Sequence, residues 1–309
     1  MRSFDYIESG KTLLTPHTTS LLAAIHEAKG RQSIQTTIRP DILGTLVAVA
    51  RIQSTDASNR IEGISTSDSR LNDLVSEKVT PRNRNEEEIA GYRDALSVIH
   101  ESHDYIPITP NVILQLHRDL FRHTPLTFAG HFKDSDNVII ERDAHGTSTV
   151  RFAPPSALVT PELIERACSA YTQAIRDGHT DPLLAIAMFI LDFICIHPFN
   201  DGNGRMSRLL TLLMLYRNGY MVGKYISIEH LIEQSKSTYY EALDASTQGW
   251  DDNANDYAPF TNYLLGIILS ACKEFDERIN LTAGGRAQGA PRVATKGCLL
   301  YTSPSPRDS

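Results

Sequence analysis

The sequence predicts an all-α protein with a single β-hairpin, and three observations support this fold class. Apolar residues recur at helical spacing in most segments of the 309-residue chain. Two nearly continuous apolar runs, 183–196 and 209–216, flank a glycine-rich loop and are typical of buried helices. Convincing runs of β-branched residues occur only between residues 137 and 152. We therefore expect helices to form the core.

Composition and charge exclude several classes of protein. Apolar residues make up 41% and charged residues 22% of the chain, which are ordinary values for a globular protein. The formal net charge is −7, so nothing suggests a nucleic-acid surface. The longest apolar run is too short for a membrane span, and Asp192 interrupts it. Because no signal peptide or C-x-x-C spacing is present, we expect free thiols and a bacterial-type cytoplasmic location.

The N-terminal region predicts helices that end in a polar turn. A partly extended lead-in precedes a helix at Ser20–Gly30, and a half-buried helix begins at Asp41. Ser58 and Glu62 lie four residues apart, so they share one face of a helix that Gly63 would end. Taken alone, this stretch is a polar helical turn with a solvated glutamate.

Two further helices are expected before the hairpin. Glu86–Leu96 opens with three glutamates, which suit the positive end of a helix dipole. Thr109–Phe121 is amphipathic and starts with Pro110 in the first turn. We expect His117 in this second helix to be packed or at the surface.

The hairpin is predicted where the hydrophobic period changes. Asn137–Glu141 and Thr147–Phe152 are β-branched runs, and Asp143–Gly146 separates them as a turn. An amphipathic helix at Ser156–Asp177 then leads into the two central helices.

The central helices have clear start and stop signals. Asp181 is a suitable N-cap with Pro182 at the first helical position of Leu183–Ile196. The second helix, Leu209–Tyr216, is stopped at Asn218–Gly219. Later helices are expected at Glu233–Leu243 and Tyr257–Ile279.

The loop between the central helices contains groups suited to phosphate chemistry. The stretch Gly202–Gly204 would leave N–H groups unpaired at the start of a helix, which makes an anion site. Arg205 and Arg208 add bidentate donors for phosphate oxygens. Asp201 offers a hard oxygen ligand for Mg²⁺, and His197 is a base whose ordinary pKa lies near neutral pH. Together these groups indicate transfer of a phosphoryl or nucleotidyl group.

The same twelve residues carry a family resemblance. The segment from His197 to Arg208, HPFNDGNGRMSR, matches the signature of Fic-domain proteins at eight specified positions. A chance match is on the order of 10⁻⁸ at average residue usage. Fic-domain proteins mostly transfer AMP from ATP to protein hydroxyls, and the resemblance covers roughly residues 41–279. It implies a helical Fic core with one hairpin and an N-terminal helical region.

The resemblance implies a role for each signature residue. His197 would take the proton of the attacking hydroxyl, and Asp201 would hold Mg²⁺. Phe199 is expected to anchor the loop in the core. The phosphates of ATP would be bound by Gly202, Asn203, Gly204, Arg205 and Arg208.

The polar turn acquires a second interpretation beside this core. Ser58-x-x-x-Glu62-Gly63 is similar to the family's inhibitory motif, placed here N-terminal to the core. In the family, that glutamate pairs with the second signature arginine, which is Arg208 in this chain. The pair obstructs productive binding of ATP, so the resemblance implies an autoinhibited enzyme.

Two other parts of the site also follow from the resemblance. In the family, a hairpin in this position is a flap that holds the target segment by strand addition, which implies that role for Asn137, Val138, Ile139 and Ile140. Family helices similar to 233–243 line the adenine site. For Tyr239 and Tyr240, contact with adenine and simple packing are equally expected.

The resemblance divides the chain into parts. Residues 1–105 would be the N-terminal helical region and residues 106–280 the catalytic core. Residues 281–297 are expected to be a flexible linker cut short before a further domain, because similar proteins often continue into a winged helix. Residues 298–309 resemble the translation of a sequencing adapter, so we expect a non-native tail.

The expected partners are ATP with Mg²⁺ and a protein that presents a Ser, Thr or Tyr hydroxyl, the chain itself included. A homodimer is left open. One alternative is removal of AMP from a modified protein, with Glu62 orienting a water. Another is a non-catalytic regulator that only senses nucleotide, although such a sensor would not need the base His197.

Overall fold

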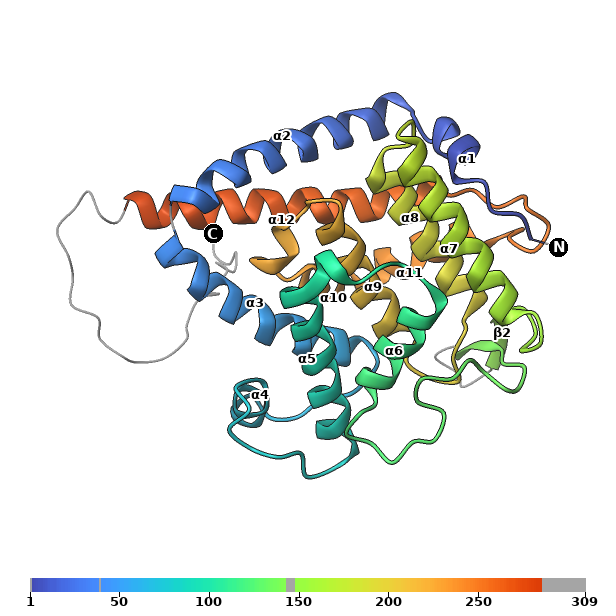
Figure 1. Cartoon of the computed structure of the whole chain (residues 1–309), viewed down its shortest axis with the longest axis horizontal. Helices are drawn as coiled ribbons and strands as arrows, with labels where there is room; N and C mark the ends of the chain where they lie inside the picture. Colours follow the sequence, from blue (N-terminus) through green and yellow to red (C-terminus); the bar gives the residue numbers. More distant parts are fainter. Residues whose placement is uncertain (1, 39, 143–147, 285–309) are drawn as a thin grey trace, which may run out of the picture.

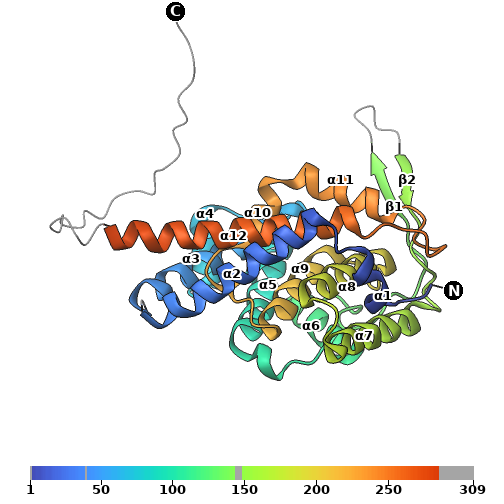
Figure 2. The same cartoon turned by 90° about the horizontal axis from the view of Figure 1, so that it is seen from above.

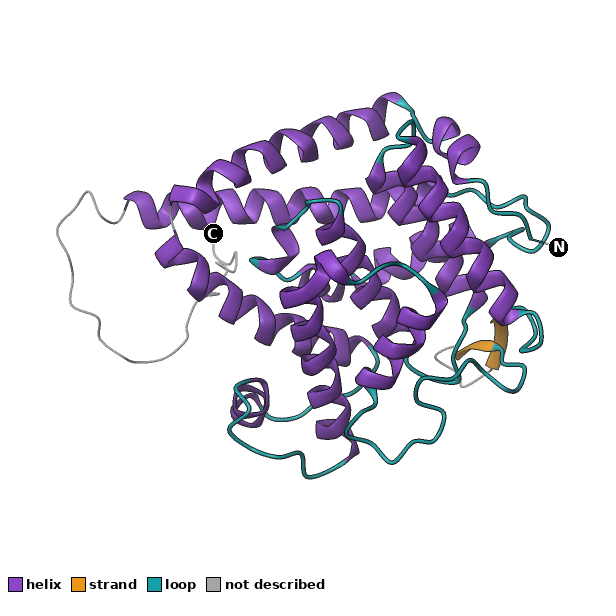
Figure 3. Ribbon diagram, viewed as in Figure 1, coloured by secondary structure: helices purple, strands orange, loops and turns teal. Residues whose placement is uncertain are grey.

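The computed structural model describes residues 2–38, 40–142 and 148–284, which form a helical protein with one two-stranded hairpin (Figures 1 and 3). The α-helices are α1 (Tyr6–Thr12), α2 (Pro16–Ile38), α3 (Pro40–Ile61), α4 (Asp68–Val75), α5 (Arg84–Ser102), α6 (Pro110–Leu120), α7 (Thr160–Asp177), α8 (Pro182–Ile196), α9 (Asn203–Arg217), α10 (Ile228–Gln234), α11 (Lys236–Thr247) and α12 (Ala258–Gly284). Short 3₁₀ helices are η1 (His103–Tyr105) and η2 (Val222–Lys224), and the strands are β1 (Ile139–Arg142) and β2 (Ser148–Phe152). The predicted all-α class is confirmed.

Helix α8 lies at the centre of the molecule. Every side chain from Leu183 to Phe193 is at most 2% exposed, because α7, α9, α11 and α12 pack around it. Asp181 caps the helix by accepting a hydrogen bond from the Leu183 N–H at 2.9 Å. The run of apolar residues therefore folds as the buried helix that the sequence predicts.

One polar side chain of α8 ties the outer segments to the centre. Asp192 is fully buried and accepts hydrogen bonds from the Arg2 guanidinium at 3.1 Å and the Trp250 indole at 2.6 Å. The hydroxyls of Tyr6 and Tyr257 each donate to its second oxygen at 2.8 Å. A buried carboxylate persists only with such partners, so this cluster fixes the N-terminal segment and the loop before α12.

Two helices are longer than the sequence predicts. Helix α2 extends beyond Ser20–Gly30 on both sides, and α12 continues five residues past Ile279. The two helices lie side by side in both views (Figures 1 and 2). Beyond Gly30, Arg31 of α2 forms an ion pair with Asp276 of α12 at 3.0 Å and Gln32 is buried, so contact with α12 accompanies the extension of the helix.

Other boundaries also differ. Helix α4 was not predicted; its Leu71, Leu74 and Val75 form a small cluster with Ile89 of α5. The helix expected at 233–243 is divided at Ser235 into α10 and α11. No helix in the described ranges is both long and apolar enough to cross a membrane.

The hairpin stands at one side of the molecule, near α11 (Figure 2). Strands β1 and β2 are antiparallel, with Ile140 opposite Val150. The predicted turn at residues 143–146 lies outside the described residues, as do most of the predicted linker and the tail, residues 285–309. The expected boundary between the N-terminal region and the catalytic core, near residue 105, stays a prediction. Side chains from both parts, from Tyr6 to Ile279, belong to one buried cluster.

The contact between α5 and α6 gives a test of the fold. A Cβ added at Gly91 of α5 would lie 1.9 Å from the carbonyl oxygen of Leu120, so Gly91→Ala forces the helices apart. We expect a loss of about 2–3 kcal/mol in the free energy of unfolding, measured by urea denaturation. Gly266→Ala in α12 is the matched control, because nothing lies within 4 Å of its added Cβ. That variant should gain roughly 0.5–1 kcal/mol, and equal effects of the two changes would contradict the packing.

Candidate active site

The loop between α8 and α9 is bounded by two residues in the left-handed backbone region. His197 ends α8 with φ of +49°, and Gly202 precedes α9 with φ of +83°. Glycine adopts this conformation without strain, whereas histidine rarely does. A Cβ on Gly202 would also come 2.8 Å from the Phe121 ring. The glycine is therefore required by conformation and by space.

Side chains from α6 and α9 hold this loop in place. The Asn203 amide accepts from the Phe199 N–H at 2.9 Å and donates to the Phe199 carbonyl at 2.8 Å. The Phe199 ring is buried and stacks on His117, with 3.7 Å between the ring centroids. His117 accepts from the Gly130 N–H at 2.9 Å, so its other nitrogen donates to the Asp201 carbonyl at 3.0 Å. Phe199 is thus the core anchor that the sequence predicts.

Arg208 of α9 is bound to the last turn of α3. Its Nε donates to the Ser58 hydroxyl, and its Nη2 donates to the Ser58 carbonyl and to the Glu62 carboxylate, each at 2.8 Å. Helix α3 ends at Ile61, and Gly63 follows in the left-handed region with φ of +79°. The structure therefore brings the predicted Ser58, Glu62 and Gly63 turn to the signature loop.

The Glu62 carboxylate is ionised in this position. Burial alone would raise its pKa, but the charge and hydrogen bond of Arg208 outweigh burial, so the pKa lies below the usual 4.5. The side chain is 33% exposed and faces a cavity. A Cβ built on Gly204 would come 2.2 Å from Glu62 Oε1. The carboxylate thus lies directly against the first turn of α9, where an anion would bind.

A cavity lies over this first turn and brings seven of the predicted residues together. Its lining includes Glu62, His197, Asn203, Gly204, Arg208, Tyr239 and Tyr240. The two tyrosines come from α11 and lie edge to face at 5.3 Å. Phe152 of β2 and Leu243 of α11 add apolar lining. The cavity therefore combines an anion-binding end with an aromatic and apolar end.

His197 is a neutral base in this cavity. Burial is the main reason that its pKa is lowered to about 4, with a smaller contribution from the charge of Lys133. Its Nδ1 lies 3.4 Å from the Ile194 carbonyl, which can only accept a hydrogen bond. The proton is therefore on Nδ1, and Nε2 has a free lone pair.

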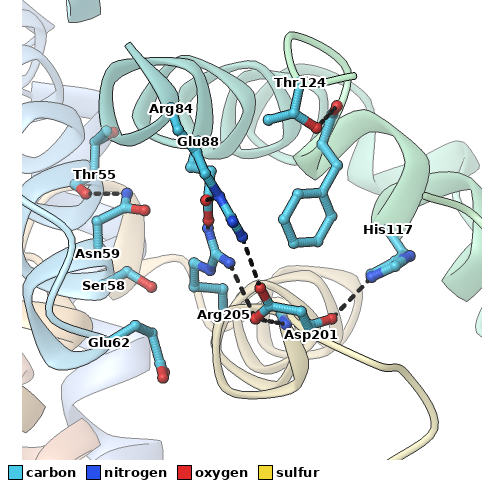
Figure 4. Close-up of polar contacts among 12 residues, drawn as sticks. Thr55, Ser58, Asn59, Glu62, Arg84, Glu88, His117, Thr124, Asp201 and Arg205 are labelled. Atoms are coloured by element: carbon cyan, nitrogen blue, oxygen red, sulfur yellow. Dashed lines mark hydrogen bonds and ion pairs between the residues drawn. The ribbon is translucent and has the colours of Figure 1, made fainter. Parts of the chain in front are cut away.

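Asp201 and Arg205 are not part of the cavity lining, and their side chains lie beside Arg84 and Glu88 of α5 (Figure 4). Arg205 is 1% exposed and forms an ion pair at 2.6 Å with Glu88, a buried residue of α5. Arg84 donates to the same Glu88 carboxylate at 2.8 Å. Both guanidiniums also approach the Asp201 carboxylate, at 3.5 Å from Arg84 and 3.7 Å from Arg205. Arg205 is thus held by Glu88 in this structure.

The exposure of the Asp201 carboxylate is compatible with binding of a magnesium ion. Its carboxylate is 45% exposed, and Mg²⁺ is commonly held by one or two carboxylates together with substrate phosphates. Among the described residues, no group of three or more His, Cys, Asp or Glu side chains could hold a metal ion. Mg²⁺ at Asp201 would therefore depend on phosphate oxygens for its other ligands.

The predicted flap residues lie just before the hairpin and in its first strand. The Asn137 side chain donates to the Phe199 carbonyl at 3.3 Å, which joins the approach to β1 to the signature loop. Val138 is exposed, and Ile139 and Ile140 are part of β1.

Three residues that support the loop were assigned no role there from the sequence: His117, which was expected only to be packed or at the surface, Glu88 and Lys133. His117 lies on the apolar face of α6 with Ile113 and Leu120, which signals burial. No sequence signal names its partner, because Asp201 is 84 residues away.

Comparison with known proteins defines the class to which this loop and fold belong. The model of the Fic/DOC family matches residues 107–215. A Fido domain-containing protein of Dictyostelium discoideum is 37% identical over 145 residues, which cover 44% of this chain and 96% of that protein. A solved Fic family protein of Desulfovibrio desulfuricans has a TM-score of 0.71 at 24% identity, covering 85% of this chain and 75% of that one. A Fic domain containing signaling protein of Bacteroides thetaiotaomicron has a TM-score of 0.69 at 22% identity, covering 83% and 98%.

The chain therefore belongs to the Fic/DOC family. It is also 25% identical over 230 residues to the protein adenylyltransferase Fic of Drosophila grimshawi, and 26% identical over 189 residues to protein adenylyltransferase fic-1 of Caenorhabditis elegans. These matches cover 72% and 59% of this chain. The chain spans less than half of the length of these two relatives, 43% and 32% respectively.

The buried His117 predicts a pH dependence of stability. Burial lowers the pKa of folded His117 from 6.5 to about 4, whereas an unfolded histidine takes up a proton near pH 6.5. Its stabilising contribution is therefore present above pH 6.5 and is lost as the pH falls toward 4. At pH 5 the loss should be about 2 kcal/mol.

Urea denaturation of wild type and His117→Asn at pH 7.5 and 5 measures this contribution. The variant should be less stable at pH 7.5 but should lose less stability on acidification. His179→Asn, a change at an exposed histidine, is the control and should leave the pH dependence as in wild type. An unchanged dependence in His117→Asn would contradict the assignment.

Proposed function

We propose that this protein transfers AMP from Mg²⁺-bound ATP to a Ser, Thr or Tyr hydroxyl of a protein and that Glu62 restrains this activity. The carrying observation is that a neutral histidine, the N-terminus of a helix and a buried arginine line one cavity. Relatives named as protein adenylyltransferases support the choice of AMP as the transferred group.

The proton of the attacking hydroxyl goes to Nε2 of His197. This nitrogen is free because Nδ1 faces the Ile194 carbonyl. A base with a pKa of about 4 stays neutral throughout the physiological range, although it is weaker than an ordinary histidine. The hydroxyl oxygen bonds to the α-phosphorus, the bond to the bridging oxygen of the β-phosphate breaks, and pyrophosphate leaves.

The first turn of α9 binds and orients the phosphates. Its first N–H groups have no acceptor within the helix, and the helix dipole adds partial positive charge. Arg208 supplies a guanidinium fork at the same end of the cavity. Tyr239 and Tyr240 line the other part of the cavity, where a flat adenine ring would fit.

Asp201 would hold Mg²⁺, whose charge offsets the negative charge of the phosphates. Arg205 acts on this carboxylate from behind, since Glu88 directs its guanidinium toward Asp201 rather than into the cavity. The direct phosphate contact expected for Arg205 from the sequence stays a prediction. The hairpin is the candidate surface for the target, because a strand edge pairs with an extended segment.

Glu62 restrains the reaction in two ways. While Glu62 and Ser58 bind Arg208, that guanidinium is not available to a phosphate. The carboxylate also lies against Gly204, so its charge and volume oppose an incoming anion. ATP would therefore bind weakly or out of line while the pair is intact.

Glu62→Gly tests the restraint. Removal of the carboxylate leaves Arg208 bound only to the neutral oxygens of Ser58, which a phosphate can displace, so AMP transfer, including self-modification, should rise by at least ~tenfold, which needs only about 1.4 kcal/mol. The measurement is incorporation of label from α-labelled ATP with Mg²⁺ and a cell lysate. Arg208→Ala is the control and should show no gain, because it also removes the phosphate ligand. Equal activity of wild type and Glu62→Gly across ATP and metal concentrations would contradict inhibition by Glu62. If the variant instead loses the ability to remove AMP from a modified target, the reverse reaction is the resting activity.

His197→Ala in the Glu62→Gly background tests the base. His197 and Arg208 are the titratable signature residues that line the cavity, and only His197 has a free lone pair. Label incorporation should therefore fall to the background level. Binding of ATP, measured by calorimetry, should persist because the α9 N-terminus and Arg208 are unchanged. Near-normal transfer by this variant would mean that the base has been assigned wrongly.

A further inference from the structure

A buried lysine outside the signature contacts the backbone on both sides of His197. Lys133 lies in the connection between α6 and β1 and is only 3% exposed. Its ammonium donates to the Ile196 carbonyl at 3.2 Å, and its backbone N–H donates to the Pro198 carbonyl at 2.8 Å. One residue thus holds the carbonyls immediately before and after the proposed base.

His197 needs such support because of its backbone conformation. A non-glycine residue in the left-handed region costs on the order of 1–3 kcal/mol and persists only when its surroundings fix it. The conformation with φ of +49° ends α8 abruptly and leaves the last carbonyls of a buried helix without intrahelical partners. The Lys133 ammonium satisfies one of these carbonyls at the position next to the base.

The contact also reaches the hairpin. The same ammonium donates to the Asn137 side-chain oxygen at 3.0 Å, and the Asn137 amide donates to the Phe199 carbonyl at 3.3 Å. Asn137 lies two residues before β1. The signature loop and the start of the hairpin are therefore joined by a single hydrogen-bonded chain.

We propose that Lys133 is a positioning residue for His197, which it holds in the reactive conformation and connects through Asn137 to the strand β1. The proposal rests on the proposed role of His197 as the base. Lys133 itself acts through the loop backbone and through its charge, without contact with the reacting atoms.

The charge of Lys133 has a separate effect on the base. Two of its three N–H donors go to neutral oxygens, those of Ile196 and Asn137. Burial lowers the pKa of Lys133 to about 8, opposed by Asp136, so the ammonium is mostly protonated at pH 7. Around His197, burial and Lys133 favour the neutral ring, whereas the Ile194 carbonyl and Glu62 favour the protonated ring. Loss of the ammonium should therefore raise the pKa of His197.

The test uses variants in the Glu62→Gly background, where transfer is measurable. Lys133→Met removes the ammonium and keeps the backbone N–H that binds Pro198. We expect kcat to fall by ~tenfold or more, the KM for ATP to change by less than about twofold, and the acid limb of the pH profile to move to higher pH. Lys133→Gln retains a donor for Ile196 without the charge, so it should recover much of kcat but show the same shift of the acid limb.

Lys224→Met is the matched control. Lys224 donates to the His100 carbonyl near the end of α5 at 3.2 Å, which is the same kind of contact at a helix other than α8. This variant should lower the melting temperature and leave kcat and the pH profile unchanged. The proposal is overturned if Lys133→Met keeps kcat within about twofold and keeps the acid limb.

A readout without turnover separates this proposal from the proposed function. Nitrogen NMR of the imidazole gives the pKa of His197 directly in Glu62→Gly and in Glu62→Gly with Lys133→Gln. A higher pKa in the second protein supports the contact even if no AMP transfer is found. An unchanged pKa overturns it even if transfer is normal, or if Lys133→Met does not fold.

Discussion

The complete burial of α8 is the constraint on which the reactive loop depends. A helix that is surrounded on every side must end inside the protein, so the polar groups of its last turn and of the following loop need protein partners. Lys133, Asn203 and His117 supply these partners from three different segments. These hydrogen bonds favour a rigid loop, because they satisfy much of its backbone. Rigidity of this kind is what positions a base and an anion site with respect to each other.

Two glutamate–arginine pairs flank the same turn of α9, and their surroundings give them different roles. Glu88 and Arg205 are both almost completely buried, with side chains 4% and 1% exposed. Breaking such a pair leaves a charge without a partner at a cost of about 3–5 kcal/mol, so this pair acts as a permanent brace behind Asp201. Glu62 is 33% exposed at the cavity, where an incoming phosphate could replace it on Arg208. The Glu88–Arg205 pair is therefore enclosed on one side of the helix, whereas the Glu62–Arg208 pair borders the cavity on the other, which is the basis of the proposed restraint.

The accuracy of the predicted elements follows the range of the forces that form them. Helix α8 and its cap at Asp181 were predicted because an apolar run and an N-cap are local signals. Helix α2 extends at both ends beyond the predicted Ser20–Gly30, because it packs along α12, which lies more than 200 residues away in the chain. Helix α4 was missed because three apolar residues in eight make a weak pattern until α5 covers them.

The sequence by itself determined which groups the proposed chemistry uses: a histidine, an acidic residue, a glycine-rich helix start and two arginines in one segment of twelve residues. It also carried the candidate inhibitory turn, since Ser58 and Glu62 lie four residues apart and Gly63 follows them. Only the tertiary structure decided which groups meet. It paired Glu62 with Arg208, 146 residues away in the chain, and Arg205 with Glu88. It also brought Lys133 into contact with the carbonyls before and after His197. The physical reason is that residue type and spacing fix local conformation, whereas pairing between distant side chains depends on how the helices pack.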